Sequence, residues 1–492
     1  MFEQGLKIGK LAQPGSLRRA ITGIAVAACA LLAAAPTAHA LPNGKVLAIP
    51  AFARKYGLPC SACHTAWPEL NNFGQVFRDN GYQLMNDRDS PIWQNPSYFP
   101  ITLRMTPNWH LENTTNQPVD ATPGVSCVPG GTPACVSKTV QMNGFDLSGM
   151  DFWTAGTLFK NVSFSLLPSS NATATFHFEN AYVRFDNLGH SSWFNLKVGK
   201  FELDNLISEK RFLFLSANGG LYQSYHFVPA GDSNNFGIGD NQLGVELAGH
   251  SANSYTRYSI AVLSATEGNV GFGNGNTVVN AGRTYDVALN FSQTFAAGSQ
   301  GYERIGAFAY IGYRPTYAMT ALGAPITGEG LGNKPFYRAG FSADLFFLNS
   351  KLEFLPLYMH GYDNVYLGTG TQANMPLPVG AHAPSWNSGF IETHYYYTPQ
   401  LVFIGRYELI RMSQQALSSN PSNQSNIDAY SIGYRWYPIM FSRAGLAFHN
   451  EYSITKSIGI IPLSADGVFL PPLAANGKVW SGSLFIGFDF DF

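Results

Sequence analysis

The chain has 492 residues and a formal net charge of −1; charged residues make up 12%, aromatic residues 14%, and 50 residues are glycine. Ordinary globular domains contain about 25% charged residues. The near-neutral charge offers no basic face, so we expect no nucleic-acid partner. Beyond the first forty residues no segment approaches eighteen consecutive apolar residues, so a membrane-spanning form of this chain has to be a β-barrel and not a helical bundle.

Residues 1–40 have the pattern of an export signal peptide. A basic segment comes first and contains Lys7, Lys10, Arg18 and Arg19. An apolar stretch follows from Ala20 to about Ala35, and small residues end at Ala40, after which we expect cleavage. A transmembrane anchor is the alternative, but the apolar run is shorter than the ~20 residues that a spanning helix needs.

Cys60, Cys63 and His64 form a C-x-x-C-H motif, the attachment signature of c-type haem. The two cysteines would form thioethers with the haem vinyl groups, and His64 would be the proximal iron ligand. A redox-active cysteine pair and half of a zinc site are the alternatives. The first needs a βαβ context and the second needs four ligands, and the sequence supplies neither. We therefore expect one covalently attached c-type haem.

The residues after the motif predict a short helix. Pro68 suits its first turn, Leu70, Phe73 and Phe77 share one face, and Asn80-Gly81 ends it. We expect this apolar face to lie on the haem, where simple packing is the alternative.

The distal haem ligand is predicted with less support from the sequence. Met85 follows the helix and is the tentative distal ligand, since Met/His ligation is common in c-type cytochromes. Met105 and His110 compete with it, and an open iron position is a further alternative. The other histidines, including His394, are scattered at no ligand spacing, so the sequence predicts no second metal site.

Cys127 and Cys135 bracket the segment CVPGGTPAC. In an exported chain such a pair is expected to form a disulfide that closes a Pro/Gly loop. Two unlinked loop thiols are the alternative.

From residue 91 to the end, large apolar residues alternate with small or polar ones. The pattern is clear in Tyr285–Ser292 and again near the end of the chain, where Trp480, Ile486 and Phe488 alternate with polar or small residues. A soluble β-sandwich also alternates, but nearly four hundred residues without a linker do not fit domains of about 100–200 residues. Tyrosine and tryptophan gather in 395–397 and 434–437, as in membrane-interface girdles.

These features predict an outer-membrane β-barrel over residues 91–492. At roughly 25 residues per strand and connection, the length gives about sixteen antiparallel strands. Sixteen strands leave an open lumen. Residues 41–90 would form a small α-helical haem domain, and a domain of this size seldom buries enough surface alone. We therefore expect the barrel lumen to be its second wall.

The elements around the haem motif form a recognisable series: Phe52-Ala53-Arg54, Gly57, Cys60–His64, Pro68, Leu70, Phe73-Gly74, Phe77 and Gly81-Tyr82. This series resembles the fused cytochrome-porin iron oxidases of iron-oxidising bacteria. The resemblance implies a porin of about sixteen strands whose periplasmic end is plugged by the cytochrome. Where relatives carry a basic residue after Phe-Gly, this chain has Gln75, which is expected to soften contacts with the haem propionates.

The resemblance also implies an activity, that of an iron:cytochrome c oxidoreductase-type Fe(II) oxidase. Fe(II) would be oxidised outside the cell, and one electron would pass through the haem to a periplasmic cytochrome or copper protein. The partners would be Fe(II), that electron carrier and outer-membrane lipid. Asp286, Asp344 and Glu353 are candidate guides for Fe(II) or simply solvated pore-lining groups.

Two other functions stay open from the sequence. In the first, the barrel is a solute or anion porin with a structural haem plug, because Asn180–Leu203 looks like the paired strands of anion-type porins. In the second, the protein is an electron conduit with another donor or with the opposite direction of transfer.

Overall fold

The computed structural model describes residues 51–86, 89–91, 100–127, 132–170, 175–207, 241–264, 285–316, 318–319, 325–326, 332–363, 385–412, 426–440, 445–458, 461–463, 468–470 and 478–491. All of them fall within one compact unit, Leu47–Phe492. The predicted signal peptide, 1–40, and the start of the predicted haem domain, 41–50, lie outside the described residues. Among the described residues, no helix is both long and apolar enough to span a membrane.

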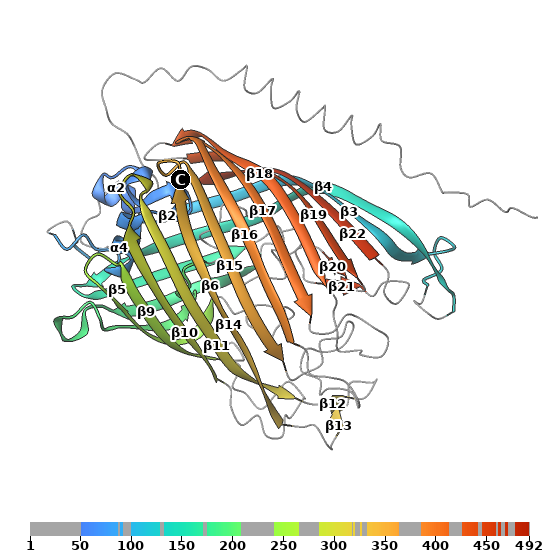
Figure 1. Ribbon diagram of the computed structural model, residues 1–492, viewed down its shortest axis with the longest axis horizontal. Helices are drawn as coiled ribbons and strands as arrows, with labels where there is room; N and C mark the ends of the chain where they lie inside the picture. Colours follow the sequence, from blue (N-terminus) through green and yellow to red (C-terminus); the bar gives the residue numbers. More distant parts are fainter. Residues whose placement is uncertain are drawn as a thin grey trace, which may run out of the picture. The chain divides into compact units, whose positions relative to one another are not determined.

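Sixteen strands of the described chain close into one antiparallel barrel (Figure 1). In barrel order they are β3 (Thr102–Asp120), β4 (Cys135–Phe159), β5 (Val162–Ser170), β6 (Phe176–Phe185), β7 (Asn195–Phe201), β8 (Gln242–His250), β9 (Thr256–Ser264), β10 (Tyr285–Ala296), β11 (Tyr302–Thr316), β14 (Gly332–Phe347), β15 (Leu352–Asp363), β16 (Ser385–Thr398), β17 (Leu401–Met412), β18 (Ile427–Met440), β19 (Gly445–Ile458) and β22 (Lys478–Asp491). The last strand, β22, pairs with the first, β3, and this pairing closes the barrel. The predicted fold class is confirmed.

Six short strands of the described chain lie outside the barrel. Two belong to the N-terminal segment, and the other four form two hairpins, β12 (Ala318–Met319) with β13 (Pro325–Ile326), and β20 (Ile461–Leu463) with β21 (Val468–Leu470). Two short 3-10 helices, η1 (Leu188–His190) and η3 (Gly298–Gln300), lie in connections between barrel strands.

The barrel wall is apolar outside and polar inside. In β10, Leu289 and Phe291 are exposed, whereas Asn290 and Ser292, which alternate with them, are buried. This is the reverse of a soluble protein, whose apolar face is inside, and it is the arrangement of a transmembrane barrel, in which lipid-facing and lumen-facing residues alternate. The alternation predicted from the sequence therefore marks the lipid face and not a core.

The same alternation corrects part of the predicted aromatic girdles. Tyr395 and Tyr397 are exposed on the outer face, as expected. Tyr396 between them points inward and donates a hydrogen bond to Glu69, and Tyr437 is buried and donates one to the Trp67 carbonyl. Consecutive strand residues face opposite sides, so a run of three aromatics cannot lie wholly in one girdle.

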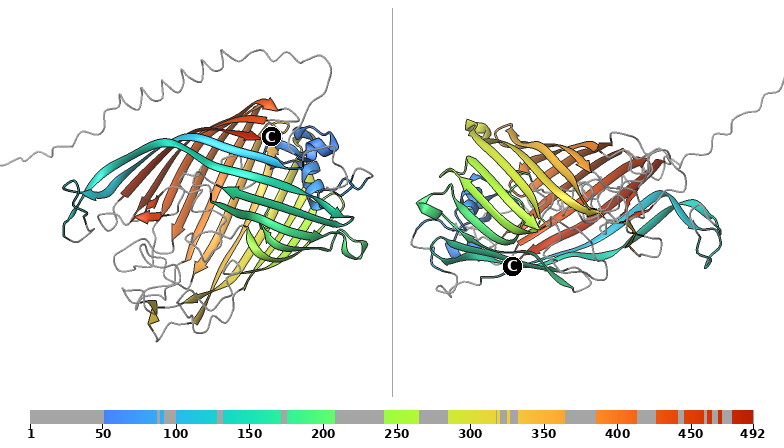
Figure 2. Two further views of the ribbon diagram at one scale, coloured as in Figure 1. Left: turned by 180° about the vertical axis from the view of Figure 1, so that it is seen from behind. Right: turned by 90° about the horizontal axis from the view of Figure 1, so that it is seen from below.

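The two ends of the barrel differ in the length of their connections. At one end several connections, such as β10–β11, β14–β15 and β16–β17, have five residues or fewer. Most connections at the other end are longer, and the longest covers residues 202–241. Figures 1 and 2 show the helices of the N-terminal segment at the short-turn end, close to the end of β22.

The N-terminal segment, residues 51–86, is called the plug below. It contains α2 (Ala51–Tyr56), α3 (Cys60–Cys63), β1 (His64–Ala66), β2 (Glu69–Leu70) and α4 (Asn72–Asp79). The helix predicted to begin at Pro68 therefore begins four residues later, because β1 and β2 form a small hairpin first. The Asn71 side chain then caps α4 by accepting a hydrogen bond from the Gly74 amide at 3.0 Å. Its predicted end is correct, with Asn80 as the C-cap and Gly81 at φ +73°.

Candidate functional site

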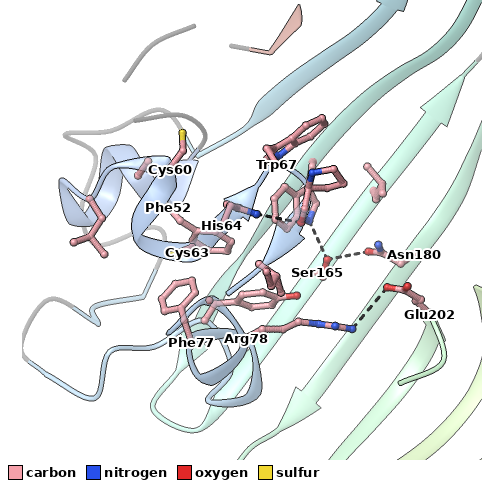
Figure 3. A pocket seen from close by; sticks show the side chains of 18 of the residues that line it. Phe52, Cys60, Cys63, His64, Trp67, Phe77, Arg78, Ser165, Asn180 and Glu202 are labelled. Carbon is pink, nitrogen blue, oxygen red and sulfur yellow. Dashed lines mark hydrogen bonds and ion pairs between the residues drawn. The ribbon is translucent and has the colours of Figure 1, made fainter. Parts of the chain in front are cut away.

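A cavity of about 250 Å³ lies at the C-x-x-C-H motif (Figure 3). Cys60, Cys63 and His64 line it from the plug, and residues of β4 to β7, including Trp153 and Tyr182, line it from the barrel wall. A second cavity nearby has only about 30 Å³. The plug thus forms one side of the larger cavity and the barrel wall the other, as expected for a haem domain too small to enclose its own core.

His64 is oriented by the backbone that follows it. Its Nδ1 lies 3.1 Å from the Pro68 carbonyl oxygen and 3.2 Å from the Glu69 carbonyl oxygen. A carbonyl only accepts, so Nδ1 carries the proton and Nε2 is the nitrogen with a lone pair. Desolvation lowers the pKa of His64 despite the opposing effect of these carbonyls, which favours the neutral ring that binds iron. This is how a metal-binding histidine is normally held.

The motif cysteines carry thiols, since neither Cys60 nor Cys63 is in a disulfide. Desolvation and then the neighbouring Cys60 raise the pKa of Cys63 to about 11. Among the described residues, no further cysteine or histidine lines the cavity to complete a zinc site.

Aromatic side chains form much of the cavity lining. Phe52 stacks on Tyr82 with ring centroids 5.0 Å apart and meets Phe77 edge-to-face at 5.1 Å. Leu70 and Phe77 line the cavity, as the predicted apolar stripe required. Phe73 does not, since it is 44% exposed. Leu70 lies in β2 and precedes α4, so the three residues do not lie on one helix as predicted.

Gln75 has a different role from the predicted one. Its Nε2 donates to Asp79 Oδ1 at 2.8 Å, and Gln75 lines the small cavity instead of the large one. The basic residues that line the large cavity are Arg78 and Lys197. Arg78 also faces Glu202 at 3.7 Å. Arg78 and Lys197, which itself pairs with Glu246, are the basic residues available to haem propionates in this cavity, and Gln75 does not reach it.

Gly74 allows α4 to pack directly on the haem motif. A Cβ at this position would lie 2.1 Å from the Cys63 carbonyl oxygen. We predict that Gly74→Ala destabilises the plug by about 1–3 kcal/mol through overpacking and lowers the yield of haem-containing protein. The matched control is Gly144→Ala, where a Cβ meets nothing within 4 Å. Thermal unfolding followed by circular dichroism measures the stability, and the haem content per chain measures the yield. Equal stability and equal haem content of the two variants would contradict the prediction.

The structure does not bring Met85 to the cavity. Met85 is 51% exposed, at φ +60°, and does not line the cavity. Met105 and His110 lie in β3 and do not line it either. Among the described residues that line the cavity, His64 is the only histidine and methionine is absent. The Met85 ligand thus receives no support, and an open iron position agrees better with the lining.

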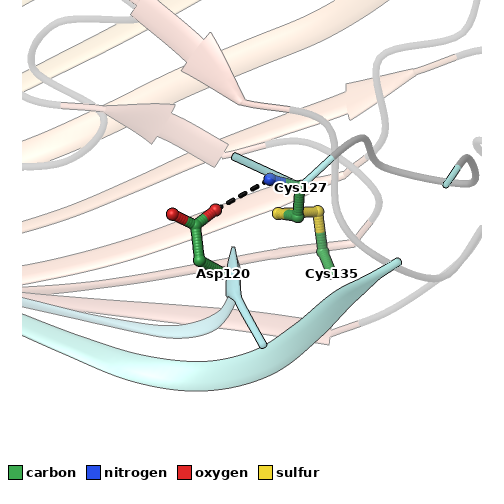
Figure 4. Close-up of a disulfide and its surroundings, with 3 residues drawn as sticks. All are labelled: Asp120, Cys127 and Cys135. Atoms are coloured by element: carbon green, nitrogen blue, oxygen red, sulfur yellow. Dashed lines mark hydrogen bonds between the residues drawn. A yellow bond between two sulfur atoms is a disulfide. The ribbon is translucent and has the colours of Figure 1, made fainter. Parts of the chain in front are cut away.

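Cys127 and Cys135 form a disulfide beside the start of β4 (Figure 4). The Cys127 amide also donates to Asp120 Oδ1 at 2.8 Å, which ties the loop to the end of β3. This pair is separate from the cavity.

The plug is fixed to the barrel on all sides. Its contacts with lumen-facing residues include Ala51 N to Thr102 of β3, Asp79 O to Arg184 of β6, the Asp79 carboxylate to Arg257 of β9, Leu70 O to Arg304 of β11, Glu69 to Tyr396 of β16, and Trp67 O to Arg435 of β18. Around the barrel, at most two strands separate each of these strands from the next. The plug therefore crosses the lumen at the short-turn end.

The structure also gathers polar residues that sequence reasoning missed. Glu69 of the plug, Glu353 of β15 and His394 of β16 offer ligand atoms within 4.8 Å of one another. Of the predicted acidic guides, Glu353 belongs to this group and Asp344 lines the same small cavity. Asp286 lies elsewhere in the lumen and accepts a hydrogen bond from Tyr310. Spacing along the chain gives no signal for such a group, since its members come from three separate elements.

No family profile and no curated protein sequence matches the chain. Among solved structures, an anion-selective porin from Comamonas acidovorans is similar at 8% identity, with a TM-score of 0.47 over 80% of this chain and 99% of that one. The outer membrane channel DcaP of Acinetobacter baumannii shares 10% identity, with a TM-score of 0.43 over 78% and 96% of the two chains. OmpT, an outer membrane protein of Vibrio cholerae, shares 8% identity, with a TM-score of 0.44 over 80% and 98%.

Proposed function

We propose that this protein is an outer-membrane electron-transfer protein that takes electrons from extracellular Fe(II) and delivers them to a periplasmic carrier through a c-type haem on Cys60 and Cys63. The observation that carries the proposal is the cavity in which Cys60, Cys63 and His64 face the barrel wall inside the lumen. A haem-attachment motif has no evident use in a barrel that only conducts solutes.

The outer face and the turns support placement in an outer membrane. Apolar side chains cover the outside of the strands, which suits lipid. In bacterial outer-membrane barrels the short turns face the periplasm and the long loops face outward. The plug lies at the short-turn end, so the haem site would be next to a periplasmic electron carrier.

The residues that would hold the haem lie together in the cavity. Cys60 and Cys63 would attach it covalently, His64 would present Nε2 because Nδ1 donates to the backbone, and aromatic residues would line its surroundings. When bound, the haem supplies a one-electron redox centre. Ferric iron is poorly soluble, so passing an electron inward leaves the metal product outside the cell.

Mixing the oxidised, detergent-purified full-length protein with Fe(II) tests the proposal. Following the haem absorption band in a stopped-flow instrument, at acidic and at near-neutral pH, we expect stoichiometric reduction of one haem per chain. Dithionite is the control, since it should reduce any accessible haem. A haem that dithionite reduces and Fe(II) does not would exclude Fe(II) as the donor and leave electron transfer with another donor or direction.

A solute porin with a structural haem plug is the second candidate. The closed barrel of sixteen strands and its polar inner face favour it, because such barrels can hold an aqueous channel. The contacts of the plug around the barrel circumference argue against an open channel, because the plug crosses the lumen at the short-turn end. Ion conductance in planar bilayers separates the two: a low conductance that rises when the plug is released supports electron transfer, and a large constitutive conductance supports the porin.

A further inference from the structure

The group formed by Glu69, Glu353 and His394 lies between the plug and the barrel wall on the histidine side of the haem motif. Glu69 connects the two sites directly, because its backbone carbonyl accepts the hydrogen bond from His64 while its side chain faces His394. All three residues are buried, with Glu353 and His394 at 0% exposure.

The arrangement of these side chains is that of a metal site. His394 Nδ1 lies 2.7 Å from Glu353 Oε2 and 3.4 Å from Glu69 Oε2. A first-row divalent ion bound at about 2.0–2.2 Å holds neighbouring ligand atoms roughly 3 Å apart. The other ring nitrogen, Nε2, lies 2.7 Å from Glu392 Oε1. A carboxylate behind the histidine is the usual partner of a metal-binding imidazole.

Three carboxylate oxygens next to this group lack a donor. Glu69 Oε1, Glu353 Oε1 and Asp344 Oδ1 are buried and have no N–H or hydroxyl donor among the described residues, although the Asp344 and Glu353 side chains interact with each other. The three residues line the same cavity of about 30 Å³, together with Arg257 and Arg304, whereas His394 lies outside its lining. The cavity has room for an ion or a water molecule. Buried carboxylate oxygens without donors are costly, and a cation would satisfy them.

The charges favour a cation as well. Asp344 pairs with Arg304, and Glu392 pairs with Arg406. Glu69 and Glu353 instead share His394 and the Tyr396 hydroxyl, whose oxygen lies 2.8 Å from Glu69 Oε2 and 2.6 Å from Glu353 Oε2 and whose single proton serves one of them at a time. Even with His394 protonated, two carboxylates face one positive charge.

We infer that Glu69, Glu353 and His394 form a binding site for a divalent first-row metal ion inside the barrel, adjacent to the haem-binding histidine. Oxygen ligands with one imidazole suit Fe²⁺, Mn²⁺ or Zn²⁺. The ion replaces the proton on Nδ1, which is released, while Nε2–H continues to donate to Glu392. Where the ion is Fe²⁺, these residues would hold a one-electron donor beside the haem site, and the haem would be the one-electron acceptor. That electron-donor role rests on the proposed function, whereas the binding does not.

Zinc binding by the full-length holoprotein tests the site, because Zn²⁺ accepts the same ligands without redox chemistry. After removal of metals with a chelator, we expect one zinc ion per chain by elemental analysis, and saturable binding by titration calorimetry. Glu69→Gln and Glu353→Gln are each expected to weaken binding about 10-fold or more, as is His394→Gln.

Glu451→Gln is the matched control, because Glu451 is an equally buried lumen carboxylate beside a histidine, His449, in β19. Haem absorption and circular dichroism establish that each variant is folded, and Glu353→Gln leaves the plug sequence unchanged if Glu69→Gln misfolds. Absence of stoichiometric zinc in the wild type, or equal zinc binding by Glu353→Gln and Glu451→Gln, would overturn the site.

Failure of the site and failure of the proposed function give different results. Zinc binding that depends on Glu353, with a haem that Fe(II) does not reduce, upholds the site and rejects the Fe(II) oxidase. The converse result is that Fe(II) reduces the haem equally fast in the wild type, in Glu353→Gln and in the presence of saturating zinc. That result would reject this site as the electron-donor site and uphold the proposed Fe(II) oxidase function.

Discussion

Replacing Cys60 and Cys63 together with serine is expected to give a folded barrel that carries no covalently bound haem. Both cysteines line the cavity, and the serine hydroxyls cannot form thioethers with haem vinyl groups. The barrel strands do not depend on the motif, since each strand pairs with its neighbours in the wall. The circular dichroism spectrum of the variant should therefore keep its β-sheet signal. The mass added by covalent haem and the haem stain on denaturing gels should both disappear completely.

The second cysteine pair supplies the control for this experiment. Cys127→Ser with Cys135→Ser removes the same number of cysteines but leaves the cavity untouched, because the disulfide links the β3–β4 connection to the first residue of β4. This variant should retain one covalent haem per chain. Covalent haem that persists in the Cys60/Cys63 variant would show that the motif is not the attachment site.

Replacing Arg257 with leucine is expected to loosen the plug more than any other single ion-pair change. Arg257 reaches from β9 into the lumen and donates to Asp79 at 2.8 and 3.1 Å and to Asp204 at 2.6 and 2.7 Å. All three residues are buried. Removing one partner of a buried ion pair typically costs about 3–5 kcal/mol, because a charge is left without compensation. Denaturant unfolding in detergent should show the haem band changing well before the barrel signal.

Arg411→Leu is the control, because Arg411 pairs with Asp428 while its side chain is 41% exposed. Exposed pairs contribute about 0–1 kcal/mol. Bilayer conductance gives an independent measurement, since release of the plug from β9 should open the short-turn end in Arg257→Leu alone. If the two leucine variants unfold at the same denaturant concentration, Arg257 does not hold the plug.

The pH dependence of this ion pair has a definite sign. Burial alone would raise the pKa of Asp79, but the charge of Arg257 outweighs it, and the pKa lies below its ordinary value of 3.8. The stabilisation is therefore present above about pH 4 and is lost as the pH falls from 3.8 through the lowered value. In Arg257→Leu the sign reverses, because protonation then relieves two buried carboxylates, and acidification should strengthen the plug.

The sequence alone was sufficient to predict those features of the structure that depend on residues close together in the chain. Alternation in segments such as Tyr285–Ser292 predicted the strands and their lipid face, and total length predicted about sixteen of them. The spacing of Cys60, Cys63 and His64 identified the candidate haem site because attachment requires all three on one short turn. The sequence predicted less accurately that Phe73 would face the haem site and that the helix would begin at Pro68. Both features depend on how the surrounding segment folds.

Contacts between distant segments could be decided only by the tertiary structure. The sequence predicted that the haem domain needs a second wall, but only the fold shows that β4 to β7 form that wall and that Gln75 contacts Asp79. Closure of the barrel brings β15 and β16 to the plug, and this places Glu353 and His394 beside Glu69. These three residues are up to 325 positions apart in the chain. Spacing along the sequence determines which side chains share a strand face or a helical turn, whereas the closed barrel determines which of those faces meet inside the lumen.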